Sequence, residues 1–235
     1  MAKANITQII HLLVKEYGRP EWRPDFQPIS TLVQTILSQN TSDANSDRAF
    51  RSLVAAFPVW EDVATADPVD IAAAIRSGGL AGIKSKRIKQ TLEEIKRIRG
   101  ALDLDFLGGM SINEARHWLK QLPGVGDKTA ACVLLFSLGE PALPVDTHIL
   151  RVSKRLGLIG DRTTPEQAHE ILPKIVPPES THEFHVLMIE HGRKTCRAQR
   201  PLCPACVLQS LCPSYERFTT EYYTGHRKTS AHLQF

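Results

Sequence analysis

The chain has 235 residues, of which 42% are hydrophobic and 23% charged, and these values are ordinary for a soluble globular protein. A chain of this length can bury a core without disulfide bonds, and no run approaches the roughly 20 apolar residues that a membrane span needs. The net charge of +4 permits a polyanionic partner without establishing one. Since no N-terminal run resembles a secretory signal, we expect a cytoplasmic protein with no membrane partner.

Apolar residues recur at helical spacing along most of the chain, and no sustained alternation of apolar and polar residues indicates a strand. In chain order, helices are predicted at 5–17, 29–37, around 49–57, and at 60–66, 69–76, 83–99, 128–138, 147–156, 165–175 and 183–193. One more opens at Ser111, where Glu114 completes a capping box. We therefore expect an all-α fold, with residues 215–235 as a C-terminal tail that lacks clear periodicity.

A turn interrupts the helical pattern between Leu119 and Lys128, where Pro123, Gly124 and Gly126 stand close together. Such a hairpin can grip a phosphate, because glycines let the backbone approach an anion and the next helix presents unpaired N–H groups. A grip of this kind recognises the DNA backbone rather than the base sequence. Taken alone, the pattern also suits an ordinary corner between two helices.

Residues 122–130, Leu-Pro-Gly-Val-Gly-Asp-Lys-Thr-Ala, are followed 18 positions after Lys128 by the aspartate of Val-Asp-Thr-His-Ile. This pattern resembles the helix-hairpin-helix DNA glycosylases of the endonuclease III family, and the resemblance extends from about Phe26 to Cys212. It implies two helical lobes with a DNA cleft between them. The lobes are expected to be a six-helix barrel with the hairpin at residues 27–141 and an iron–sulfur cluster lobe at residues 1–26 and 142–214.

The resemblance assigns catalysis to Lys128 and Asp146, on opposite walls of the cleft. As nucleophile, the neutral Lys128 amine would displace the base and form a Schiff base with the sugar, and β-elimination would then cut the strand. The positive end of the helix dipole would favour that neutral amine. An ionised Asp146 would stabilise the oxocarbenium-like sugar or shuttle the lysine proton. Without the motif, Lys128 could equally be a phosphate contact and Asp146 a helix N-cap.

Four of the five cysteines lie in one short stretch, as Cys196-x6-Cys203-x2-Cys206-x5-Cys212. In a chain without a signal peptide, this crowding indicates a metal centre rather than disulfides. Only one close pair is present, whereas structural zinc usually uses two, so an iron–sulfur cluster is favoured and zinc is the alternative. The resemblance implies a [4Fe–4S] cluster. Arg193 and the other basic residues nearby are predicted to contact the DNA backbone, with a simply solvated charged face as the alternative.

An enzyme that acts on a base in a duplex must flip the base out and fill the gap. The family's gap-filling glutamine corresponds to Asn40 in the stretch Ser-Gln-Asn-Thr-Ser-Asp at 38–43, and Gln39, one residue earlier, is the alternative. Leu80 corresponds to the family's apolar wedge on the opposite strand. Further DNA contacts are predicted in the hairpin, at Gly124, Gly126 and Thr129.

The resemblance as a whole implies a bifunctional DNA glycosylase and abasic-site lyase that removes oxidised pyrimidines from double-stranded DNA in base excision repair. The expected protein is a monomer associated with the nucleoid of a prokaryote. Two alternatives stay open: a mismatch or modified-base glycosylase of the same superfamily, and a DNA-binding paralogue with weak or no turnover. Lys128 argues against the first, because those glycosylases generally lack it. The intact Lys128 and Asp146 argue against the second, while the altered loop at 38–43 leaves it open.

Overall fold

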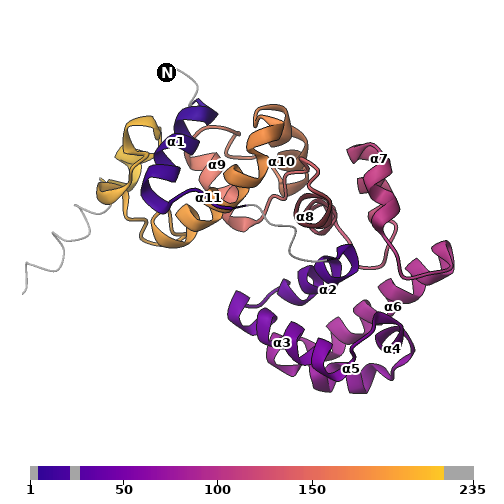
Figure 1. Cartoon of the computed structure of the whole chain (residues 1–235). Coiled ribbons are helices and arrows are strands. Elements are labelled where there is room, and N and C mark those ends of the chain that lie inside the picture. Colours follow the sequence, from indigo (N-terminus) through magenta and orange to yellow (C-terminus); the bar gives the residue numbers. More distant parts are fainter. Residues whose placement is uncertain (1–4, 22–26, 220–235) are drawn as a thin grey trace, which may run out of the picture. The chain divides into compact units, whose positions relative to one another are not determined.

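The computed structural model describes residues 5–21 and 27–219, and the regular elements within these ranges are all helical (Figure 1). The predicted all-α fold is therefore confirmed for the described ranges. None of the helices there has both the length and the apolar character that crossing a membrane requires. The chain divides into two compact units, one holding residues 27–144 and the other holding residues 5–21 together with 145–219.

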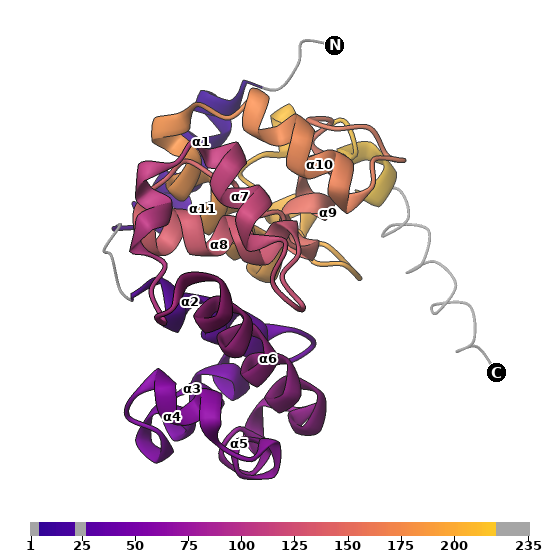
Figure 2. The ribbon, with the colours of Figure 1, turned by 90° about the vertical axis from the view of Figure 1, so that its right-hand side faces the viewer.

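The unit at 27–144 is built around α2, which packs against α3, α6 and α8 (Figure 2). Its α-helices are α2 (Pro28–Ser38), α3 (Asp43–Ala56), α4 (Trp60–Thr65), α5 (Pro68–Ala74), α6 (Ala81–Arg99), α7 (Ile112–Leu119) and α8 (Asp127–Leu138), with 3₁₀ turns η1 (Arg76–Gly78) and η2 (Asp105–Gly109) between them. Leu32, Ile36 and Leu37 of α2 are fully buried. The loop that follows α2 therefore starts from the core of the unit.

Local chemistry explains where several of these helices begin and end. Ser111 N-caps α7 in the predicted capping box, since its Oγ accepts from the Glu114 N–H at 3.3 Å and Glu114 Oε2 accepts from the Ser111 N–H at 3.0 Å. The helix α6 begins at Ala81, two residues before the predicted start at Ile83. Leu80 forms the turn before the helix, and Ala81 and Gly82 are already helical although the apolar pattern begins only at Ile83.

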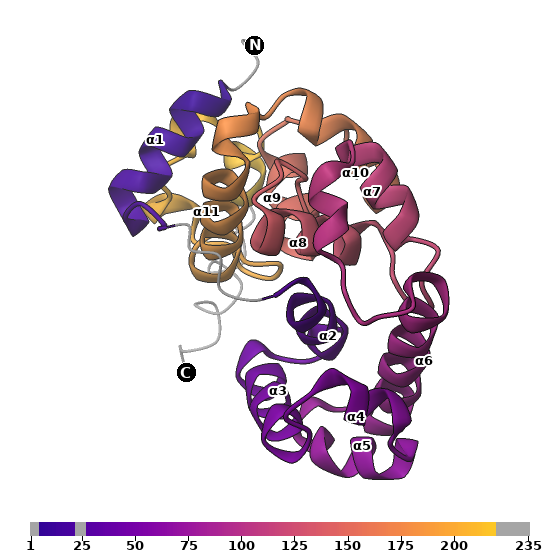
Figure 3. The same cartoon turned by 45° about the vertical axis from the view of Figure 1, so that its right-hand side comes forward.

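The second unit, with residues 5–21 and 145–219, joins segments from both ends of the sequence. Its α-helices are α1 (Ile6–Tyr17), α9 (Thr147–Arg155), α10 (Pro165–Ile171) and α11 (Thr181–Lys194), and α11 packs against both α1 and α9 (Figure 3). The helix α10 ends at Ile171 and not at 175 as predicted, because Pro173 has no N–H to donate and the chain continues as the 3₁₀ turn Leu172–Lys174.

Two contacts hold the helices of this second unit close together. The Tyr17 hydroxyl lies 3.0 Å from His191 Nδ1 and 2.9 Å from Thr195 Oγ1, which connects α1 to the end of α11. A Cβ on Gly192 would lie 2.9 Å from the Cβ of His148, so the glycine permits the close approach of α11 to α9. His148 thus has a packing role in the unit.

The C-terminal end of the described part is helical at residues 215–219, where Thr219 Oγ1 donates to the Tyr215 carbonyl oxygen at 2.9 Å. The segment predicted as an irregular tail at 215–235 therefore begins as a helix. The rest of that predicted tail, residues 220–235, lies outside the described residues.

Candidate DNA-binding and catalytic site

The turn between α7 and α8 contains the two glycines of the predicted hairpin. Gly124 has a φ of +76°, and a Cβ there would overlap the side chain of Arg87, so the position requires glycine. Gly126 is extended and N-caps α8 without any side-chain cap. Its carbonyl accepts the first helical hydrogen bond, from Ala130 at 2.9 Å, so the N–H groups of the first turn, including that of Lys128, have no partner in the helix. This arrangement suits an anion.

The side chains at the start of α8 differ in exposure. Lys128 is half-buried on the first turn, directly after Asp127, whose carboxylate pairs with Lys120 Nζ at 2.7 Å. Thr129 is only 4% exposed, so its side chain is withdrawn from solvent. A DNA contact by Thr129 would therefore run through its backbone N–H.

Asp146 belongs to the other unit, where it N-caps α9. Its Oδ1 accepts from the Ile149 N–H at 2.8 Å. The backbone just before it is held by His169, whose buried Nε2 accepts from the Val145 N–H at 3.1 Å. In a neutral ring the proton is then on Nδ1, which lies 2.9 Å from the Pro165 carbonyl oxygen. The sequence contains no signal for this role of His169, since its partner Val145 is distant in the chain.

The two loops predicted to enter the duplex both contain a left-handed residue other than glycine. Asn40 has a φ of 53° and is exposed, and Leu80 has a φ of 51° and is 52% exposed. Leucine adopts this conformation at a cost, and such outliers gather at functional sites. Gln39 differs from its neighbour, because its Oε1 accepts from Arg87 Nη1 at 2.6 Å. Of the two gap-filling candidates, Asn40 is the one that the structure leaves exposed at the loop tip.

One polar stripe on α6, which was not predicted from the sequence, contacts the loop with Asn40, the loop with Leu80 and the hairpin. Lys84 Nζ donates to the carbonyl oxygens of Leu37 at 2.6 Å and Gly78 at 2.7 Å. Arg87 holds Gln39, and Thr91 Oγ1 lies 2.8 Å from the Pro123 carbonyl oxygen, which it can donate to. A signal for Lys84 was present, because it continues the helical spacing of the apolar residues Ile88, Leu92 and Ile95.

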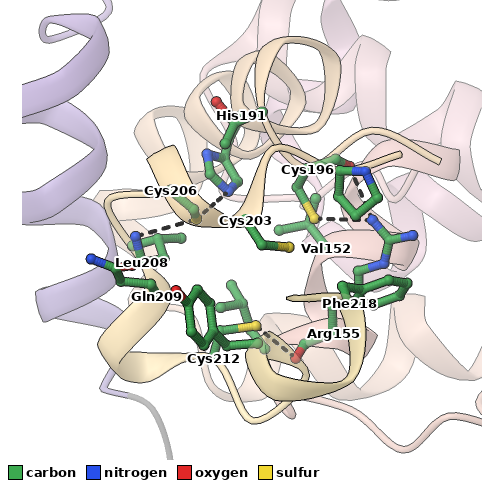
Figure 4. Close-up of a pocket in the computed structure, with 14 residues that line it drawn as sticks. Val152, Arg155, His191, Cys196, Cys203, Cys206, Leu208, Gln209, Cys212 and Phe218 are labelled. Carbon is green, nitrogen blue, oxygen red and sulfur yellow. Dashed lines mark hydrogen bonds between the residues drawn. The ribbon is translucent and has the colours of Figure 1, made fainter. Parts of the chain in front are cut away.

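The four clustered cysteines line one pocket in the second unit, between α9, α11 and the loop at 196–212 (Figure 4). Apolar walls of the pocket come from Val152, Leu156 and Leu208. Two N–H groups point at sulfurs: Arg155 Nη1 lies 3.3 Å from Cys196 Sγ and the Leu208 N–H lies 3.4 Å from Cys206 Sγ. Such N–H···S contacts stabilise thiolates that are bound to iron.

Burial affects how Cys203, Cys206 and Cys212 titrate. It raises the pKa of the Cys206 thiol to about 11 and also raises the pKa values of Cys203 and Cys212, because a low-dielectric pocket disfavours thiolate charge. Binding of a metal centre would therefore release thiol protons. Burial also lowers the pKa of His191 to about 4, so the imidazole beside Cys206, with Nε2 at 3.7 Å from Sγ, is neutral.

The donor set of this pocket bears on the metal centres that the sequence allowed. All four thiols come from one short loop, and N–H groups are directed at two of the sulfurs. Four cysteine thiolates are the ligand set of an iron–sulfur cluster, and hydrogen bonds to the sulfurs are typical of such sites. The residues present therefore fit a cluster.

A basic surface lies next to the cysteine loop, made of Arg193, Lys194, Arg197 and Arg200, all exposed. Lys194 pairs with Glu190 at 2.6 Å, and Arg197 Nε donates to the Lys194 carbonyl oxygen at 3.1 Å. Arg200 has a φ of 49°, another left-handed residue in a loop predicted to meet DNA.

Three comparisons with known proteins agree. The sequence pattern of the HhH-GPD superfamily of base excision DNA repair proteins matches residues 33–178. Endonuclease III of Thermotoga maritima is 36% identical over 212 residues, which cover 90% of this chain and 94% of that protein. The structure is similar to that of a non-covalent endonuclease III–DNA complex, with a TM-score of 0.81, 29% identity, and coverage of 94% of this chain and 99% of that one.

A relative in Arabidopsis thaliana has higher identity over a shorter match. It is 41% identical over 162 residues, which make up 69% of this chain and 55% of that protein. The chain thus spans about half the length of the plant relative and nearly all of the endonuclease III relative from Thermotoga.

Proposed function

Because this chain belongs to the HhH-GPD superfamily of base excision DNA repair proteins and is an endonuclease III-like DNA glycosylase, we propose that it removes oxidised pyrimidines from double-stranded DNA and is also an abasic-site lyase. The observation that carries the proposal is the hairpin, in which Lys128 is half-buried on the first turn of α8, beside N–H groups that have no acceptor within the helix. Those N–H groups can bind the phosphates that flank a damaged nucleotide, and this brings the amine to the sugar.

Lys128 supplies the nucleophile in the proposed reaction. Its neutral amine attacks the sugar C1′, the bond between C1′ and the base breaks, and the base leaves with the bonding electrons and takes up a proton. Opening of the sugar ring gives a Schiff base between C1′ and Nζ. Loss of a C2′ proton then expels the 3′ phosphate, which cuts the strand.

Asp146 supplies the carboxylate. It has one oxygen bound to the Ile149 N–H, and the backbone before it is held by His169, so the carboxylate has a defined orientation. Its negative charge stabilises positive charge that develops on the sugar and assists proton transfer at the lysine.

The proposed cofactor is a [4Fe–4S] cluster held by Cys196, Cys203, Cys206 and Cys212, which line one pocket. When bound, such a cluster cross-links the loop at 196–212 and supplies a centre of one-electron redox chemistry. The Arg155 guanidinium places positive charge beside Cys196 Sγ, and the Leu208 N–H donates a hydrogen bond to Cys206 Sγ. The adjacent surface with Arg193 then contacts the DNA backbone.

We assign opening of the duplex to the two loops that contain a left-handed residue, Asn40 or Leu80, and call them the left-handed loops. Asn40 fills the space that the flipped base leaves, and Leu80 enters as the apolar wedge from the opposite strand. Support for these roles comes from their exposure and from the backbone strain at both positions. The expected form is a monomer associated with the nucleoid of a prokaryotic cell.

Borohydride trapping on a duplex with a single abasic site tests the proposal, because it captures the Schiff base. Lys128→Ala should abolish the trapped complex and strand cleavage, since no other proposed nucleophile is present. Binding to DNA should weaken modestly, with the salt slope lowered by about one unit. Lys96→Ala, which removes an exposed lysine at the end of α6, is the matched control. Wild-type yield of the trapped complex from Lys128→Ala protein would make this residue a phosphate contact only.

A further inference from the structure

Lys84 is among the largest buried side chains of the described residues, with 2% of its surface exposed. Lysine is rarely buried, because moving its charged end out of water is costly unless that end is hydrogen-bonded. The Lys84 Nζ donates to the carbonyl oxygens of Leu37 and Gly78, at 2.6 and 2.7 Å. The Lys84 ammonium group is therefore hydrogen-bonded to two backbone carbonyls that are far apart in the sequence.

Both carbonyls lie at the start of a loop that enters the proposed DNA site. Leu37 is in the last turn of α2, directly before the loop with Asn40. Gly78 ends the 3₁₀ turn η1, directly before Leu80 and its neighbouring glycine. A single nitrogen atom is thus bonded to the starting points of both left-handed loops, and it holds them at a fixed spacing.

Further residues on the same face of α6 contact the hairpin between α7 and α8, which is the third loop of the proposed DNA site. One turn later, Arg87 donates to Gln39 beside Asn40 and packs against Gly124 of the hairpin. Another turn later, Thr91 Oγ1 lies 2.8 Å from the carbonyl oxygen of Pro123. Within the unit, α6 therefore acts as a common support for all the loops that are proposed to contact DNA.

We propose that Lys84 is a positioning residue for base flipping, which sets the spacing between the Asn40 loop and the Leu80 loop so that both side chains enter the duplex together. This inference rests on the proposed function of the chain. A side chain misplaced by about 1 Å can lower a rate by about two orders of magnitude, so a loosened spacing affects the step that needs both loops. That step is the opening of a stacked base pair, which an abasic site does not require.

Lys89 provides a matched control on the same helix. Its Nζ donates to the Ala66 carbonyl oxygen at 2.7 Å, so it also connects α6 to a backbone carbonyl of the unit. That carbonyl lies after α4 and far from both left-handed loops in the sequence. Lys89→Met therefore removes the same kind of bond without touching either loop.

The first measurement compares Lys84→Met and Lys89→Met on two duplexes, one with an oxidised pyrimidine in a pair and one with an abasic site. Lys84→Met should lower single-turnover base excision by about tenfold or more and change abasic-site cleavage by less than about threefold. Lys89→Met should leave both rates within about threefold of wild type. If Lys84→Met loses both activities equally, or neither, Lys84 has no positioning role in base flipping. Lys84→Gln, which keeps a shorter donor, replaces the Met variant if the latter does not fold.

The second measurement does not depend on activity. Hydrogen exchange of backbone amides in the free protein should become faster in Lys84→Met both at residues 38–43 and at 79–82, and in neither segment in Lys89→Met. Unchanged exchange in either segment would overturn the inference even if excision falls. If wild-type protein excises no oxidised pyrimidine, the proposed substrate is wrong, and the exchange result still decides whether Lys84 joins the two loops.

Discussion

One oxygen of the Asp146 carboxylate is bound to α9, and this makes two roles of the residue separable. The cap bond from the Ile149 N–H needs a side-chain oxygen but no charge. The proposed chemistry needs the negative charge itself. Asparagine keeps the oxygen and removes the charge, so a single substitution distinguishes the two roles.

Asp146→Asn should remain folded, because asparagine is as good an N-cap as aspartate, while single-turnover base excision falls by about 10² to 10⁴. Thermal unfolding and excision kinetics on the same preparation measure the two effects. Asp161→Asn, at an exposed aspartate of the same unit, should change neither. Excision at the wild-type rate by Asp146→Asn protein would leave only the capping role.

At the scale of elements, the hairpin between α7 and α8 uses its two glycines for different purposes. Gly124 is left-handed and packed against Arg87, whereas Gly126 has an ordinary φ and open space where a Cβ would be. The first glycine is therefore needed for folding of the turn. The second leaves the backbone N–H groups of α8 open to close approach by a phosphate.

Substitution by alanine should separate these purposes. Gly124→Ala should lower the free energy of unfolding by about 1–2 kcal/mol, from left-handed strain alone, and should displace Arg87. The midpoint of thermal unfolding would then fall by several degrees, on the order of 2–4 °C for each kcal/mol. Gly126→Ala should keep that midpoint and weaken binding to undamaged duplex, measured by fluorescence anisotropy. The reverse pattern, with Gly126→Ala unstable and Gly124→Ala silent, would contradict this view of the hairpin.

At the scale of the whole molecule, the second unit combines residues 5–21 with residues 145–219, and the cysteine loop at 196–212 is attached to the helices of this unit. Arg155, in the last turn of α9, bonds to Cys196 Sγ, and its side chain also donates to the carbonyl oxygens of Arg197 and Ala198 at 2.6 and 3.1 Å. Its guanidinium also lies over the ring of Phe218, 4.4 Å from the ring centre. The loop at 196–212 and the helical segment at 215–219 are thus joined to α9 through one side chain.

Purified protein should be yellow-brown, with broad absorbance near about 400 nm and about four irons per chain, because thiolate-bound iron–sulfur clusters absorb in this range. Cys206→Ser should lose this absorbance and the iron. Cys132→Ala, which changes the buried cysteine of α8, should keep both. Metal analysis by mass spectrometry provides the measurement. A colourless protein that contains one zinc ion per chain would contradict the cluster.

Features that depend on neighbouring residues could be predicted from the sequence alone. The helices from α1 to α11 follow apolar residues at spacings of three and four, and Ser111 and Asp146 cap helices through bonds to residues three positions away. The cysteine spacing likewise predicts that the four thiols gather at one place, and they do line one pocket, while the metal centre itself stays a prediction. The start of α6 and the end of α10 were less predictable, because the turn at Leu80 decides the first and Pro173 decides the second.

Only the tertiary structure decided which polar side chains are buried and what they bind. Lys84 and Leu37 are 47 positions apart, Arg87 and Gln39 are 48 apart, and Val145 and His169 are 24 apart. The sequence by itself places Lys84 at the spacing of the apolar residues of α6, but a lysine in a lysine-rich helix is ordinarily solvated. Whether such a residue is buried depends on the helices packed over it, and its hydrogen bonds depend on which backbone carbonyls that packing leaves without partners.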